Sequence, residues 1–130
     1  MSRRFMALIG AALFVVLQAC STEPVRKVQE FISPNKGQAA LTTGLKQYEE
    51  GDYPGATKNL ASALEQGLND RDRVSAHKHL AFMQCASNRE RQCRDEFRKA
   101  LAIDPALELA PAEAKHPVWG PIFRALKSGR

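Results

Sequence analysis

The sequence predicts an all-α fold built from two antiparallel helix hairpins and a C-terminal capping helix. Three observations predict this class. Apolar residues recur at intervals of three and four positions in successive segments, which is the spacing of one helix face. Glycine, asparagine, aspartate and proline separate the segments at places typical of helix starts and stops. Finally, no alternating apolar and polar run is long enough to predict a strand.

Four helical segments are expected between Gly37 and Pro105. Their apolar stripes are, in order, Leu41, Leu45 and Tyr48; Ala56, Leu60, Ala63 and Leu64; Val74, His77, Leu80 and Ala81; and Cys93, Phe97, Ala100 and Leu101. The segments are interrupted or stopped at Gly51-Asp52, Gly67, Ser87-Asn88 and Asp104-Pro105. A side-chain cap from Asp70 or Asp72 is expected to start the third helix.

The C-terminal segment has the pattern of a capping helix. Trp119, Ile122, Phe123 and Leu126 fall at positions i, i+3, i+4 and i+7, and the helix is expected to end at about Lys127. The preceding stretch, 116–121, is proline-rich and is expected to lead into its first turn. Two hairpins alone would leave an apolar face open, so this helix is expected to cover it.

The two hairpins carry an internal repeat. Gly44, Ala56, Leu60 and Ala63 are separated by 12, 4 and 3 positions, and so are Ala81, Cys93, Phe97 and Ala100. In each set a small residue on both helices allows the helices to approach closely, and a large residue fills the space between them. The two sets are offset by 37 residues.

These positions, together with the turn Gly51-Asp52-Tyr53 and the exit 100–105, resemble the tetratricopeptide repeat (TPR), a unit of 34 residues. The resemblance covers 37–105. The repeat offset is three residues longer, which we assign to a lengthened loop at 67–73, and Ala40 and His77 stand where the family has an early aromatic. A generic array of four helices remains an alternative. The resemblance implies a concave surface that binds an extended or helical peptide.

The N-terminus is predicted to be a secretion signal. Arg3 and Arg4 precede 13 uncharged residues, Phe5 to Leu17, a run too short to span a membrane. The following 17–20 segment, LQAC, resembles the lipobox of bacterial lipoproteins. That resemblance implies cleavage before Cys20 and acylation of this residue, although ordinary cleavage leaving a free thiol is the alternative. Residues 1–19 are therefore predicted to be the signal peptide, 20–36 the lipidated tether, and 37–130 the helical domain.

This N-terminus predicts a location in the bacterial cell envelope. Ser21 after the cysteine favours the outer membrane, facing the periplasm, by analogy with enteric lipoproteins. Loss of Arg3 and Arg4 with the signal would lower the formal net charge from +5 to +3. A net charge of this size, spread along helices, does not favour a nucleic-acid partner.

The remaining cysteines, Cys85 and Cys93, flank a bend between two antiparallel helices. In an oxidising envelope they are predicted to form a disulfide, and two small buried thiols are the alternative. A metal site with His77 and His79 is not expected, because residues two apart on a helix point to different sides. His116 is expected to act in capping or packing.

No enzyme motif is found, and no cofactor or metal is expected. The sequence of 130 residues is too short for a nucleotide-binding domain plus a substrate domain, and it lacks a phosphate-binding glycine loop and a GxSxG motif.

A binding role is expected instead. The predicted partner-binding residues, assigned by the TPR resemblance, are Leu41, Leu45, Tyr48, Glu49, Lys78 and Phe82. Alternatively, the tether or Trp119 covers the leucines and leaves no groove. The predicted function is an envelope-anchored adaptor that recruits or positions a protein of a secretion-type or pilus-type assembly. The alternative is a non-catalytic structural lipoprotein that maintains the outer membrane or cell wall.

Overall fold

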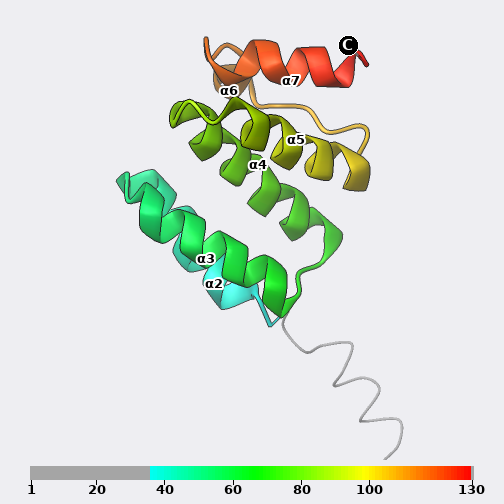
Figure 1. The fold of residues 1–130 in the computed structure, drawn as a ribbon. Coiled ribbons are helices and arrows are strands. Elements are labelled where there is room, and N and C mark those ends of the chain that lie inside the picture. The colour runs from blue at the N-terminus through cyan, green and yellow to red at the C-terminus, as the bar shows by residue number, and fades with distance from the viewer. Residues whose placement is uncertain (1–35, 130) are drawn as a thin grey trace, which may run out of the picture. The chain divides into compact units, whose positions relative to one another are not determined.

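A computed structural model describes residues 36–129, which form an all-α unit of six helices without a strand (Figure 1). The predicted signal peptide, Cys20 and the tether up to residue 35 lie outside the described residues. The helices are α2 (Gln38–Glu50), α3 (Tyr53–Gln66), α4 (Asp70–Ala86), α5 (Glu90–Ile103), α6 (Pro111–Ala114) and α7 (Trp119–Lys127). Each of the four helices expected before Pro105 is present, and so is the predicted C-terminal helix.

Helices α2 and α3 form the first hairpin, joined by a two-residue turn (Figure 1). Gly51 ends α2 with a φ of 81°, a left-handed conformation that glycine adopts without steric cost. Asp52 then caps α3, because its Oδ1 accepts a hydrogen bond from the Gly55 backbone N–H at 3.0 Å. At the open end, the Gly37 N–H donates to the Gly67 carbonyl at 3.0 Å and ties the start of α2 to the end of α3.

Helices α4 and α5 form the second hairpin, and its start differs from the prediction in two ways. Asn69 is the cap, with its Oδ1 accepting from the Asp72 N–H at 2.9 Å, so the assignment of the cap to Asp70 or Asp72 was wrong. The loop contains only 67–69, because residues from Asp70 onward already belong to α4. The lengthened loop predicted for 67–73 is therefore also wrong. The amide oxygen of Asn69 caps a helix as well as a carboxylate does, which allows the earlier start.

All eight positions of the internal repeat are buried. In the first hairpin, Gly44 lies directly against Leu60: a Cβ placed on Gly44 would come within 2.9 Å of Leu60 Cγ and 3.1 Å of its backbone nitrogen. The small residue at this position therefore sets how closely α2 and α3 approach. In the second hairpin, Cys93 and Phe97 are fully buried, as the large and small pattern predicts.

Helix α4 is buried on several sides and contributes to both parts of the core. Ala76, Leu80 and Met83 pack into the cluster formed with α2 and α3. Phe82 and Cys85 pack into the second cluster, formed with α5 and the C-terminal segment. A helix with apolar residues around much of its circumference is stable only when neighbours cover it, and α4 has them in both hairpins.

The C-terminal segment covers the second hairpin through α7, which contacts both α4 and α5. Phe123 is 3% exposed, and its ring lies 5.2 Å from that of Phe97 in an edge-to-face arrangement. Leu109, in the connection before α6, is buried in the same cluster. This covering follows the sequence expectation that the C-terminal segment protects the apolar face of the last hairpin.

We predict that Gly44→Val lowers the free energy of unfolding by about 2 kcal/mol, because the added atoms overpack the contact with Leu60. Thr43→Val is the matched control, since it places the same side chain on an exposed neighbouring position of α2. Urea unfolding followed by circular dichroism measures both variants. Equal stability of the two variants would show that the α2–α3 approach does not depend on a small residue at Gly44.

Candidate functional site

Charged and aromatic side chains from α2, α4 and α6 gather around Lys78. We name Tyr48, Glu49, Lys78, His79 and Glu113 the Lys78 cluster. Lys78 Nζ donates to the two carboxylate oxygens of Glu113 at 2.9 and 3.2 Å. The two side chains are 19% and 24% exposed, so the ion pair is partly shielded from water but still reachable. Because 35 residues separate them in sequence, the pair holds α6 against α4.

His79 follows Lys78 in α4 and contacts Tyr48 of α2. Its Nδ1 is 2.8 Å from the Ser75 carbonyl oxygen, which can only accept, so this nitrogen carries the proton and Nε2 is left as an acceptor in the neutral ring. The ring meets Tyr48 edge-on, with centroids 5.0 Å apart. Burial lowers the pKa of His79, although the hydrogen bond to Ser75 opposes this effect. The neutral imidazole is therefore favoured at this position.

Glu113 is held in its charged form, while Tyr48 keeps its proton. Burial raises the pKa of Glu113, but hydrogen bonds from Lys78 and the Ala110 N–H outweigh it, so the pKa lies below its ordinary value. Burial raises the pKa of Tyr48, and the nearby Tyr53 and Glu113 add to this effect. Glu49 is exposed and close enough for its charge to act on His79.

A stack of aromatic rings lies beside the cluster. Trp119 stacks on Phe82 at 4.7 Å between centroids, and His116 stacks on Trp119 at 3.2 Å. The Trp119 indole N–H donates to the Glu113 carbonyl at 3.0 Å, which links the stack to the cluster. His116 therefore has the packing role predicted from the sequence. Its Nδ1 also accepts from the Val118 N–H at 3.2 Å.

Of the predicted partner-binding residues, Tyr48, Glu49 and Lys78 come together in the cluster, and Leu45 lies half-buried against the first core cluster. Leu41 and Phe82 do not line an open surface, because they are only 2% and 1% exposed. Their assignment as partner contacts was therefore wrong. Leu41 packs within the α2–α3–α4 core, and Trp119 covers Phe82.

Cys85 and Cys93 lie at disulfide-bonding distance, with their Cα atoms 5.1 Å apart. Both are buried, one in the last turn of α4 and the other in the first turn of α5. A covalent bond at this place closes a short loop around the turn and contributes about 2–3 kcal/mol to stability. The pair fixes the end of the second hairpin, away from the Lys78–Glu113 contact that joins α4 to α6.

His77 points to a different side of α4 from His79, as predicted from their spacing. Its Nδ1 lies 2.6 Å from Glu96 Oε2, and Lys99 Nζ lies 2.6 Å from the other oxygen. Burial raises the pKa of Glu96, but the hydrogen bonds from His77 and Lys99 outweigh it and lower the pKa overall. The His77–Glu96 contact joins α4 to α5, and Lys99 supports Glu96 from the same helix, so the group has a structural role. Among residues 36–129, no group of three or more His, Cys, Asp or Glu is placed to hold a metal ion.

Sequence reasoning missed two members of the cluster, His79 and Glu113. A local signal existed for Glu113, since proline at the first position of a helix with glutamate two residues later is typical of a helix N-terminus. That signal predicts the bond to the Ala110 N–H but not the contact with Lys78, which depends on how the chain folds back. No local pattern predicts the contact of His79 with Tyr48, because it depends on how α2 approaches α4.

Comparisons of this chain with protein-family models, curated proteins and solved structures gave no match. Among the helices of residues 36–129, none combines the length and the apolar character needed to cross a membrane.

We predict that stability falls as the pH is lowered from about 7.5 to about 5.5, and that His79→Gln makes this fall smaller. The folded state lowers the pKa of His79, so below about pH 6.5 the unfolded chain binds a proton that the folded chain does not. The lowered pKa values of Glu96 and Glu113 act in a more acidic range. Urea unfolding at both pH values gives the measurement. An undiminished fall in the variant would assign the pH dependence to other groups.

Proposed function

We propose that this chain is a lipid-anchored adaptor of the bacterial cell envelope that binds a segment of a protein partner on the Lys78 cluster. The single observation that carries the proposal is the cluster itself, in which charged and aromatic groups from α2, α4 and α6 meet at a partly exposed surface. Such a mixture of groups suits a peptide, because aromatic rings contact its apolar side chains while charged groups fix its polar ones.

The groups of the cluster define what the partner segment supplies. Glu49 is exposed and forms no ion pair in the described part of the chain, so it is available to a basic side chain or a backbone N–H of the partner. His79 Nε2 is an acceptor in the neutral ring. Tyr53, 48% exposed and 5.8 Å from Tyr48 between ring centroids, extends the aromatic surface. A segment with basic and apolar residues therefore fits this face.

The TPR-like arrangement is part of this proposal. It is supported by the equal spacing of the two repeat sets, by the burial of all eight positions, and by α7 lying against the second hairpin where a further repeat would stack. In such arrays the first helix of each pair lines the binding surface. The cluster draws Tyr48 and Glu49 from α2, and Lys78 and His79 from α4, which are the first helices of their hairpins.

The anchor rests on the N-terminal sequence, where 13 uncharged residues, Phe5 to Leu17, are followed directly by Gln-Ala-Cys. Acylation of Cys20 would anchor the domain to the periplasmic face of the outer membrane. The length of residues 20–36 would then set how far the domain extends from the membrane. On this proposal the adaptor positions a component of a secretion-type or pilus-type assembly. It supplies contacts and placement, with no chemical step of its own.

We predict that Glu49→Lys lowers the yield of the crosslinked partner about tenfold, a loss of about 1.4 kcal/mol in binding. The charge reversal places a cation where the basic partner segment docks. The measurement is crosslinking of the full-length chain in the cells that produce it, followed by affinity purification and identification of the crosslinked protein.

Glu65→Lys is the matched control for this experiment, because Glu65 is an exposed acid on α3, outside the cluster. It should leave the yield unchanged. The same loss in both variants would assign the effect to net charge rather than to the cluster. Equal partner capture by Glu49→Lys and the parent would remove the cluster from the interface and favour the structural lipoprotein.

We also predict that Cys20→Ser moves the chain from the membrane fraction to the soluble periplasmic fraction, because serine provides no thiolate for the thioether to the lipid. Cell fractionation with immunoblotting measures the distribution. Thr22→Ser is the matched control, since it changes a residue close to Cys20 but leaves the lipobox and the Cys85–Cys93 pair intact. Membrane association that survives Cys20→Ser in washed membranes would overturn the anchor.

A further inference from the structure

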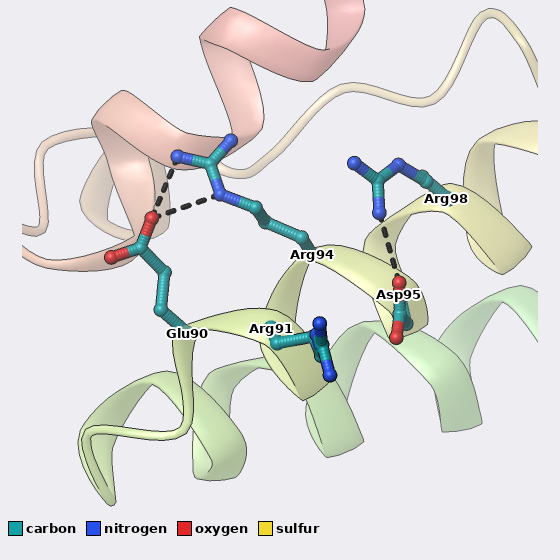
Figure 2. Close-up of a pocket in the computed structure, with 5 residues that line it drawn as sticks. All are labelled: Glu90, Arg91, Arg94, Asp95 and Arg98. Carbon is teal, nitrogen blue, oxygen red and sulfur yellow. Dashed lines mark hydrogen bonds and ion pairs between the residues drawn. The ribbon is translucent and has the colours of Figure 1, made fainter.

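A second surface, on α5, is lined by arginines and lies outside the Lys78 cluster. Five residues of α5 line an open surface hollow of about 420 Å³: Glu90, Arg91, Arg94, Asp95 and Arg98. Figure 2 shows their side chains rising from the same helix, with Arg94 turned toward Glu90, Arg98 toward Asp95, and Arg91 separate from both pairs. Arginine is the residue best suited to recognise carboxylates, because its planar donors match their geometry.

The arginines of this hollow keep unused hydrogen-bond donors. Arg94 uses Nε and Nη2 to hold Glu90 at 2.9 and 2.8 Å, and Arg98 uses Nη1 to hold Asp95 at 2.9 Å (Figure 2). Arg91 forms no ion pair within residues 36–129. Since a guanidinium has five N–H donors, most of the donors lining the hollow are available to a ligand. The two acids steady the side chains of Arg94 and Arg98 through exposed pairs, which an incoming carboxylate can replace.

A second hollow shares Arg98 with the first and includes apolar side chains in its lining. Arg98 lines both, and the second, also of about 420 Å³, is completed by Leu101, Ala102, Leu126 and Gly129. Along α5 the order is therefore three arginines followed by apolar residues. Arg91, Arg94 and Arg98 stand at i, i+3 and i+7, and span about 10 Å along the helix axis.

We propose that this groove of α5 and α7 binds an acidic amphipathic helix of a protein partner. A helix with carboxylates at i, i+4 and i+7 repeats them at the spacing of the arginines, and an apolar residue one turn beyond reaches Leu101 and Leu126. This surface goes beyond the proposed function, because it uses a different helix and selects acidic rather than basic segments.

The lining favours a helix over an anionic membrane surface. Glu90 and Asp95 leave the hollow with a formal charge of only +1, and a continuous layer of phosphates would approach both acids as well as the arginines. A helical peptide carries its carboxylates at discrete positions, so they can face the arginines without facing Glu90 and Asp95. The hollow shape also suits inserted side chains better than a flat array of headgroups.

The test uses the full chain and a synthetic helical peptide of about 20 residues, long enough to be helical, with Glu at i, i+4 and i+7 and Leu one turn beyond at either end. Binding is measured by fluorescence anisotropy, with a peptide carrying Gln at the three Glu positions as the reference. The expected result is that the Glu peptide binds at least about tenfold more tightly than the Gln peptide, and that salt reduces this difference.

The matched variants decide where the peptide binds. A triple variant of α5 should weaken Glu-peptide binding about tenfold; it carries Arg91→Gln, Arg94→Gln and Arg98→Gln. The control variant removes the same charge from α3 and α4 and should leave Glu-peptide binding unchanged; it carries Lys58→Gln, Arg71→Gln and Arg73→Gln. Equal loss in both triple variants, or equal binding of the Glu and Gln peptides, would overturn the proposal. So would binding to phosphatidylglycerol vesicles that requires the α5 arginines while the peptide does not bind.

Discussion

The packing of α4 against the α2–α3 hairpin on one side and against α5 and α7 on the other is the constraint on which the rest of the structure depends. Phe82 illustrates it: this residue of α4 is 1% exposed, and its ring contacts Tyr48 of α2, Phe97 of α5 and Trp119 of α7. Aromatic rings in such edge-to-face and stacked contacts contribute more than their buried area alone. One side chain therefore orients three other helices around α4. Without it, the cap formed by α7 would lose its main contact with the centre of the fold.

The proposed binding surface follows from this central position of α4. Its apolar side chains are directed to the two core clusters, so its polar ones are left where the neighbouring helices do not cover it. Lys78 and His79 lie about one helical turn before Phe82 in α4. Lys78 contacts Glu113 of α6, and His79 contacts Tyr48 of α2. The contacts that bury Phe82 thus also bring Tyr48 and Glu113 to Lys78 and His79. The core and the Lys78 cluster are built from the same interhelical contacts.

Much of this fold could be predicted because its signals are local. Gly51, Gly67 and Asp104 mark real helix ends, and the paired spacing of Gly44 with Ala56 and of Ala81 with Cys93 identifies positions that are buried. The site was less predictable, because burial depends on contacts made across the fold. Leu41 and Phe82 share a helix face with residues that remain accessible, and no local pattern shows that α4 or Trp119 covers them. The contact of Lys78 with Glu113 likewise depends on the path of the chain through the connection after α5.

The two proposed surfaces differ in how their charges are bound. In the Lys78 cluster the ion pair spans 35 residues and joins two helices, so its loss would loosen the attachment of α6. On α5 the pairs are Arg94 with Glu90 and Arg98 with Asp95, each within one turn of the same helix. Local pairs of this kind contribute about 0.3–0.5 kcal/mol to a helix and do not hold elements together. The arginines of α5 can therefore exchange their carboxylate partners without disturbing the fold. Lys78 is instead suited to keep its bond with Glu113, because that bond holds α6 in place. In the proposed binding role, direct recognition therefore falls to Glu49, Tyr48 and His79, while the Lys78–Glu113 pair holds their surroundings in place.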